Sequence, residues 1–295
     1  MDDNEIAKLV KAGKIAKETV EFASSFILPG MPLLEIAEKI ENKIIELGGK
    51  PAFPVNLSMN ELAAHSTPSL NDTFLAGGLL KVDIGIHLDG YVADTAISLD
   101  LENSPENKAL ISSAELALQK AIEKLSHGIK IREIGAEIEK TISSSGFSPI
   151  ANLSGHSIER WTLHAGITIP NFDNSQDKQL IPGVYAIEPF STTGTGSVKD
   201  GKSSGIYSLK QEGNVRDSLA REILAFIREE YKTLPFCSRW ICKKFGSRAL
   251  LSLQRLKESG ILHNYPQLIE AKKGKVAQAE HTIIFQKDKI IVTTI

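Results

Sequence analysis

An internal duplication is the feature of this sequence that most restricts how the chain can fold. Residues 30–41 align without gaps on residues 128–139, with glycine, glutamate and isoleucine identical at matching positions. The tripeptide Asn-Leu-Ser follows in both copies, at 56–58 and at 152–154. A single match between amphipathic helices can arise by chance, whereas an ordered series of matches indicates two copies of one structural unit.

The series continues with a histidine and then with an apolar segment that ends in a carboxylate. His65 in the first copy corresponds loosely to His164 in the second, and the segment ending in Asp83 matches the one ending in Glu188. We therefore predict two related halves. A pseudo-two-fold axis between them would bring the carboxylates of both halves around one centre.

The sequence around the first carboxylate predicts a β-hairpin. Residues 81–94 alternate apolar and polar side chains, and Asp89-Gly90 favours a type I′ turn because glycine tolerates positive φ. With these two residues in the loop, Asp83 and Asp94 become diagonal neighbours on one face of the hairpin. Such carboxylates repel each other unless a cation or a shared proton compensates, and we favour a divalent metal over a solvated pair.

The duplication also predicts a second hairpin that begins at Glu188. Glu280, in the stretch 276–285, suits the position of the second carboxylate of that hairpin. Because Glu188 and Glu280 lie far apart in sequence, we predict an insertion over 194–273 between the two strands. The four carboxylates would then form the oxygen-rich centre that a dinuclear metal site requires.

The predicted insert is helical and basic. Helical periodicity extends over 217–232 and over 247–262. Between 199 and 275 the chain has sixteen Lys and Arg residues against eight Asp and Glu residues. A basic lobe of this kind could contact the ribosome or RNA, although a solvated, mildly basic face is the simpler interpretation.

One imidazole would shift the metal preference of the centre away from Ca and Mg toward Mn, Fe, Co or Zn. The best source is His156, which follows a glycine that permits close backbone approach and precedes the Glu188 segment. Two such ions can share a water molecule, lower its pKa and polarise the carbonyl group that it attacks. His65 and His164 would then be unligated imidazoles beside the reacting group.

Composition excludes several classes of protein. The chain has 42% hydrophobic and 24% charged residues, as soluble globular proteins do, and its apolar runs are too short for a membrane span. Cys237 and Cys242 have no Cys or His cluster around them, so we expect neither a zinc cluster nor a disulfide framework. We expect a cytoplasmic protein. Its N-terminus predicts an amphipathic helix with apolar residues at Ile6, Leu9, Val10 and Ile15.

Five motifs together are highly specific for one family. They are PAFPVNLSMNELAAH at 51–65, KVDIGIHLDGYVAD at 81–94, NLSGHSIERWTLHAG at 152–166, YAIEPF at 185–190 and QAEHTII at 278–284. With them, the chain resembles type II methionine aminopeptidases of the archaeal form over nearly its whole length. The resemblance implies an α/β (α+β) pita-bread fold, in which two duplicated halves with flanking helices form a curved antiparallel sheet that holds two metals.

The same resemblance implies a division of the chain and a set of metal ligands. A catalytic domain would comprise 1–193 and 274–295, and an inserted helical, winged-helix-like subdomain would comprise 194–273. Two divalent ions (Co, Mn, Fe or Zn) would be shared by the bridging Asp94 and Glu280. The full ligand set implied by the resemblance is Asp83, Asp94, His156, Glu188 and Glu280.

The resemblance further implies how the site would act. A metal-bridging hydroxide would attack the first peptide carbonyl, with Glu188 as the proton shuttle. His164 would contact the carbonyl oxygen, and His65 would lie near the scissile nitrogen. Phe53 resembles a wall of the methionine pocket, although ordinary core packing is an alternative for it.

The activity implied is removal of the initiator methionine from nascent chains and peptides with a small second residue, by a monomer without a membrane partner. One alternative is an Xaa-Pro peptidase, which usually has an extra N-terminal domain, whereas this chain reaches its first repeat at Gly30. Another is a non-catalytic RNA- or ribosome-binding relative that has lost its metals. The presence of all five ligands favours the peptidase.

Overall fold

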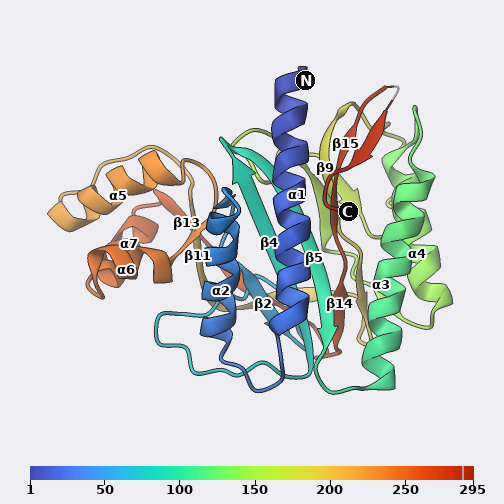
Figure 1. Ribbon diagram of the computed structural model, residues 1–295, viewed down its shortest axis with the longest axis horizontal. Helices are drawn as coiled ribbons and strands as arrows, with labels where there is room; N and C mark the ends of the chain where they lie inside the picture. The colour runs from blue at the N-terminus through green and yellow to red at the C-terminus, as the bar shows by residue number, and fades with distance from the viewer. Residues whose placement is uncertain (288) are drawn as a thin grey trace.

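Two halves with the same order of elements form the body of the molecule in the computed structural model, which describes residues 1–287 and 289–295 (Figure 1). The elements of the first half are α1 (Asp3–Phe26), α2 (Leu33–Glu46), β1 (Lys50–Pro51), β2 (Asn56–Met59), β3 (Leu62–Ala64), β4 (Leu79–Leu88) and β5 (Tyr91–Asp100). Those of the second half are α3 (Pro105–Lys124), α4 (Ile131–Ser144), β6 (Ser148–Pro149), β7 (Ser154–Ile158), β8 (Thr168–Pro170), β9 (Gly183–Ile187), β10 (Phe190–Thr192), β14 (Val276–Gln278), β15 (His281–Phe285) and β16 (Ile290–Val292).

The duplication predicted from the sequence is visible in matching local structure. Helices α2 and α4 each have 14 residues. The glycine before each of them has a positive φ, 84° at Gly30 and 82° at Gly128, a conformation that glycine adopts without steric cost. The two halves also share an isolated antiparallel bridge just before the helix, Pro32–Leu75 in the first and Lys130–Gln179 in the second.

The first hairpin has the predicted register. Leu88 is opposite Tyr91, and Gly85 is opposite Asp94. Both loop residues have positive φ, 52° at Asp89 and 87° at Gly90, as a type I′ turn requires.

The second hairpin is also confirmed. Ile187 of β9 is opposite His281 of β15, and Phe190 of β10 is opposite Gln278 of β14, so one register continues through both strand pairs. Thr193 N donates a hydrogen bond to Lys275 O (3.1 Å), where the chain leaves the hairpin at its tip.

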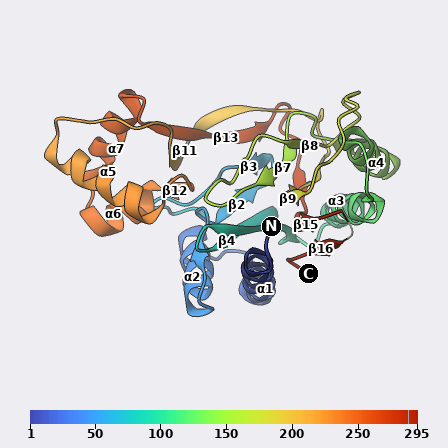
Figure 2. The same ribbon diagram turned by 90° about the horizontal axis from the view of Figure 1, so that it is seen from above.

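The segment beyond that tip lies on the opposite side of the body from α3 and α4 (Figure 2). Its elements are β11 (Val198–Leu209), α5 (Ser218–Glu230), β12 (Phe236–Cys237), α6 (Ser238–Phe245), α7 (Ala249–Glu258) and β13 (Leu262–Glu270). Helix α5 lies within the predicted 217–232, and the Asp217 side chain caps it by accepting from Ala220 N. The second helix is shorter than the predicted 247–262, because Gly260 has a φ of 75° and Leu262 begins β13.

This segment is joined to the body in two ways. Strand β13 pairs with β3 of the first half, which extends the sheet β12-β11-β13-β3 across the boundary. Arg239 of α6 also forms a buried, bidentate ion pair with Glu41 of α2, in which both N–O distances are 2.7 Å. Arg239 Nε donates in addition to Pro68 O (3.1 Å).

Helices cover one face of each half. Ile36, Ile40 and Ile44 of α2 are fully buried against the first sheet, and α4 packs on the second in the same way. In α1, Leu9 and Ile15 are buried as predicted, whereas Val10 is 37% exposed. The prediction that Val10 belongs to the buried stripe of α1 is therefore wrong.

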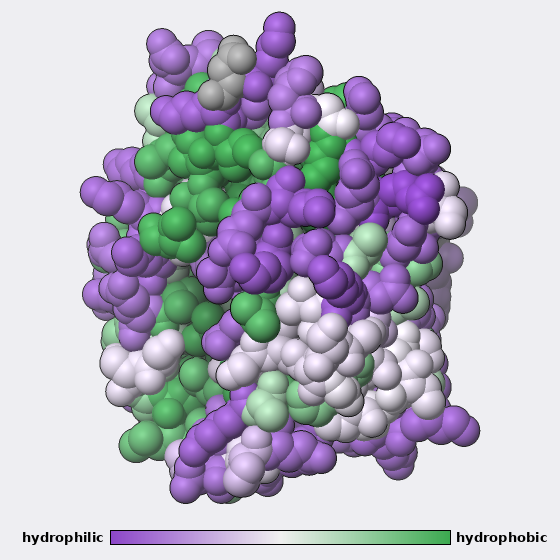
Figure 3. Space-filling model, turned by 90° about the vertical axis from the view of Figure 1, so that its right-hand side faces the viewer, coloured by the Kyte–Doolittle hydropathy of each residue, from purple (hydrophilic) through white to green (hydrophobic). Residues whose placement is uncertain are grey.

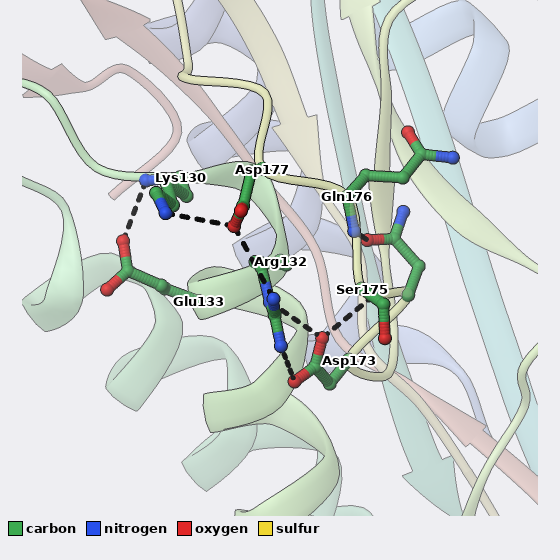
Figure 4. Close-up of polar contacts among 8 residues, drawn as sticks. Lys130, Arg132, Glu133, Asp173, Ser175, Gln176 and Asp177 are labelled. Carbon is green, nitrogen blue, oxygen red and sulfur yellow. Dashed lines mark hydrogen bonds and ion pairs between the residues drawn. The ribbon is translucent and has the colours of Figure 1, made fainter.

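Ion pairs hold α4 to the loop that follows β8 (Figure 4). Arg132 Nε and Nη2 donate to the two carboxylate oxygens of Asp173, at 3.0 and 2.8 Å. Lys130 Nζ donates to Asp177 Oδ1 at 2.9 Å. These side chains are about a third or more exposed to solvent, so each pair contributes at most about 1 kcal/mol to stability.

The face that carries α3, α4 and β16 shows hydrophobic surface between hydrophilic side chains (Figure 3). A groove of about 320 Å³ there is lined by Leu118, Ile122, Val292 and Ile295.

Within the described ranges, no helix combines the length and the apolar character needed to cross a membrane. Cys237 and Cys242 are both buried, and among the described residues neither forms a disulfide bond.

Candidate metal centre

The predicted ligands line one cavity of about 330 Å³ between the two hairpins. Its walls include all five of them, together with Phe53, His65 and His164. The cavity therefore brings together every site residue singled out from the sequence. The five predicted ligands that line it are Asp83, Asp94, His156, Glu188 and Glu280.

Asp94 lies on β5 and Glu280 lies between β14 and β15, where segments from the two halves run side by side at the centre. Thr282 Oγ1 accepts a hydrogen bond from Asp94 N (2.7 Å) and donates one to Asp94 O (2.8 Å). Thr95 Oγ1 donates to Glu280 O (2.8 Å), and Ala96 forms a β-bridge with Glu280. Backbone and threonine contacts thus fix the two carboxylates close to each other.

Ligand-type atoms of Asp94, His156 and Glu280 all lie within 4.8 Å of one another. His156 Nε2 is 3.6 Å from Asp94 Oδ2 and 3.7 Å from Glu188 Oε1. These distances are too long for hydrogen bonds. The imidazole of His156 thus lies close to both carboxylates without bonding to either, as ligands of a shared cation would.

Burial makes the ionised forms of these carboxylates unfavourable. It raises the pKa of Asp83 from 3.8 to about 7. Burial first, and then repulsion from neighbouring carboxylates, raises the pKa values of Asp94, Glu188 and Glu280 well above their ordinary range. Burial and the neighbouring His164 lower the pKa of His156 to about 3, so the imidazole is neutral and able to bind a metal.

A divalent cation fits this donor set. Asp83 Oδ1, Asp94 Oδ1 and Glu280 Oε2 are buried and have no hydrogen-bond partner among the described residues. Buried carboxylate oxygens without partners are costly, and a cation would satisfy them. Oxygen ligands with one imidazole suit Mn, Fe, Co or Zn.

The raised pKa values predict that metal-free protein loses stability as the pH rises. Carboxyl groups with a folded pKa above the unfolded one bind more protons in the folded state. For Asp83, the contribution of the protonated carboxyl group to the free energy of unfolding is fully present below pH 3.8, its unfolded pKa. This contribution is lost as the pH rises through about 7, its folded pKa. In the presence of a metal chelator, we expect the Tm of the protein to be roughly 10 °C lower at pH 8 than at pH 5.

Thermal unfolding followed by circular dichroism, with and without chelator, checks this expectation. Added Mn or Co should restore the Tm at pH 8 and have much less effect at pH 5. A Tm that is equal at both pH values in chelator would contradict the charge repulsion argued above.

The two histidines predicted to be unligated, His65 and His164, lie at the cavity wall. His65 has a φ of 56°, which is uncommon for a non-glycine residue, and its Nδ1 lies 3.1 Å from Pro266 O. Because a carbonyl only accepts, Nδ1 carries the proton and Nε2 is left as an acceptor. The His164 ring meets the His156 ring edge-on at 4.4 Å, and burial and His65 lower the His164 pKa to about 4.

Phe53 lies between the cavity and the buried core. It lines the cavity and belongs to a buried cluster that includes Leu163. A Cβ atom at Gly85 would lie only 2.2 Å from Phe53 Cε1, so the absence of a side chain at Gly85 makes room for the ring.

Some residues of the site were not identified from the sequence. Gln278 Nε2 lies 3.5 Å from Asp83 Oδ2 and 3.4 Å from Glu188 Oε2. Its position two residues before Glu280 could have indicated it, because residues at that spacing share a strand face. Ile206 and Tyr265 also line the cavity, from β11 and β13, strands that periodicity did not reveal.

Comparisons with known proteins identify the family. Residues 7–287 match the model of metallopeptidase family M24. A methionine aminopeptidase from Pyrococcus abyssi is 50% identical over 98% of this chain and 99% of its own length. One from Methanocaldococcus jannaschii is 44% identical over 97% of each chain.

The crystal structure of a methionine aminopeptidase from Thermotoga maritima superposes with a TM-score of 0.72 at 22% identity, covering 100% of this chain and 98% of that one. This likeness confirms the predicted pita-bread fold. The chain therefore belongs to metallopeptidase family M24 and, within that family, to the methionine aminopeptidases that include these archaeal proteins.

Proposed function

We propose that the cavity between the hairpins is the catalytic site of this methionine aminopeptidase. Its family membership makes the activity removal of an N-terminal methionine by metal-dependent hydrolysis. The observation that carries the assignment is the convergence of buried carboxylates on one neutral imidazole within 4.8 Å. The proposed metal ligands are Asp83, Asp94, His156, Glu188 and Glu280.

We propose two ions for charge reasons. Four carboxylates need four positive charges for neutrality, which two divalent ions supply. Asp94 and Glu280, at the junction of the hairpins, would contact both ions. His156 and Glu188, whose side chains lie 3.7 Å apart, would complete one ion, and Asp83 the other. Co, Mn, Fe and Zn all suit these donors.

The bound ions supply polarisation of the peptide carbonyl and a lowered pKa for the attacking water. Glu188, with a side chain 14% exposed, can accept a proton and deliver it to the departing amine. His164, which is neutral, can donate a hydrogen bond to the carbonyl oxygen as charge develops there. His65 Nε2 can accept from the scissile N–H.

The proposed methionine pocket is the apolar part of the cavity, where Phe53 and Leu163 form adjoining walls. An apolar slot suits a flexible thioether side chain. A cavity of about 330 Å³ that also receives the reacting peptide leaves little space beyond it, which supports a preference for a small second residue.

The natural substrates proposed are the N-termini of nascent polypeptides. Ribosome contact through the basic segment 199–275 stays a prediction, and its charge excess is reduced by pairs with acids of the body, such as Lys243–Glu38 and Lys275–Glu102. The monomeric state, the cytoplasmic location and the division into 1–193 with 274–295 and 194–273 also stay predictions.

Methionine release from a Met-Ala-Ser peptide tests the proposal. Protein stripped by chelator should be inactive, and Mn, Fe, Co or Zn should restore release, with an Xaa-Pro peptide left uncleaved. Cleavage of the Xaa-Pro peptide would favour the alternative peptidase. Folded protein that releases nothing with any metal would favour the non-catalytic alternative.

A further inference from the structure

The loop that carries His164 connects β7 to β8, and its last residues are hydrogen-bonded to β7. Ala165 N donates to Ser157 O (2.8 Å), and Ile167 N donates to Ser157 Oγ (3.0 Å). These bonds hold the end of the loop that follows His164. Before His164, Glu159 and Thr162 exchange two backbone hydrogen bonds (2.9 Å each), and Trp161 between them makes contacts outside the second half.

The turn of the first hairpin supplies the first of these contacts. Trp161 N donates to Gly90 O (2.9 Å), and Arg160 Nε donates to Asp89 O (2.9 Å). The indole packs directly on the turn, since a Cβ atom at Gly90 would lie 2.4 Å from Trp161 Cε2. The His87 ring also lies beside the indole, with ring centroids 5.0 Å apart.

The inserted segment supplies the second set of contacts. Lys232 Nζ lies 5.2 Å from the centroid of the indole, within the range of a cation–π interaction. Thr233 Oγ1 donates a hydrogen bond to Trp161 O. Trp161 itself has a φ of 64°, a conformation that a bulky residue keeps only where its surroundings impose it.

We infer that Trp161 is a positioning residue that holds His164 at the reacting carbonyl. Trp161 lies three residues before His164 and joins the loop to the first hairpin and to the insert. Leu163, between them, is buried in the cluster that contains Phe53. This inference rests on the function proposed above for His164.

Variants at Trp161 test the inference through kcat and KM for Met-Ala-Ser. We expect Trp161→Ala to lower kcat about 10- to 100-fold, as misplaced catalytic groups do, and to change KM by less than about twofold. Trp161→Phe keeps a ring against Gly90 and should recover most of the lost kcat. Gly90→Ala should reproduce the loss, because its methyl group would displace the indole.

A double-mutant cycle separates positioning from simple packing. If Trp161 acts through His164, Trp161→Ala should cause no further loss of kcat in a His164→Ala background. Additive losses would overturn the inference, and so would an unchanged kcat for Trp161→Ala. A His164→Ala variant with normal kcat would instead overturn the function proposed for His164.

The other tryptophan of the chain provides the matched control. Trp240 lies on α6, where its Nε1 donates to Glu41 Oε2 (2.9 Å) and its ring stacks on Tyr231, with centroids 5.7 Å apart. Trp240→Ala should lower the Tm and leave the kcat of the folded protein unchanged. Equal losses of kcat from Trp240→Ala and Trp161→Ala would show a general loss of stability and overturn the inference.

Discussion

Replacement of Glu280 by alanine is expected to lower kcat/KM for methionine release by at least about 1,000-fold, with loss of bound metal. Glu280 is 1% exposed and lies at the junction of the two hairpins, where its carboxylate would contact both ions. Glu280→Gln keeps the shape but removes the charge, and we expect nearly the same loss. Peptide kinetics and metal content by atomic emission measure both effects.

The fold of the Glu280 variants should survive, because the substitution removes repulsion from a metal-free cluster. Their Tm in chelator at pH 8 should equal or exceed that of the unaltered protein. Glu115→Gln is the matched control, since Glu115 has a carboxyl pKa raised by burial but lines the groove beside α3, outside the site. Full metal content and normal activity in Glu280→Ala would exclude Glu280 as a ligand.

Replacement of Glu41 by alanine is expected to lower the free energy of unfolding by about 3–5 kcal/mol, because it leaves the guanidinium of Arg239 buried without a partner. Arg239 is 1% exposed and Glu41 is 7% exposed. Urea denaturation measures the change. Because the pair joins α2 to α6, the contact between the inserted segment and the body should weaken as well.

Two controls define this effect. Replacing both partners with apolar residues, as Glu41→Leu with Arg239→Met, should cost much less, because no uncompensated charge remains. Glu35→Ala removes an exposed partner of Lys39 and should cost less than about 0.5 kcal/mol. A loss below about 1 kcal/mol for Glu41→Ala would mean that water reaches Arg239.

Local patterns were sufficient to predict the first hairpin and to bring Asp83 and Asp94 together. The register follows from one two-residue turn and from the alternation of side chains. Repetition of the same pattern then located Glu188 and Glu280, although the two residues are far apart in sequence.

Long-range contacts account for what the sequence did not reveal. Strand β11 contains the polar stretch DGKSSG at 200–205, which has no apolar alternation, and it is stabilised by pairing with β13. Tyr265 reaches the cavity only through that pairing. The surroundings of Trp161 come from three segments of the chain, so no local pattern could indicate them.

The position of the insert at the hairpin tip has a consequence for the order of folding. Asp83 and Asp94 meet when a two-residue loop closes, whereas Glu188 and Glu280 must wait for their strands to meet across a long intervening segment. The entropic cost of closing a loop rises with its length, and a segment that folds first brings its own ends together. Thr193 and Lys275 are hydrogen-bonded to each other where the insert joins the hairpin. A folded insert would therefore shorten the loop that separates the strands of Glu188 and Glu280. We therefore expect Asp83 and Asp94 to meet early in folding, and the complete metal-binding centre to form only after the inserted segment has folded.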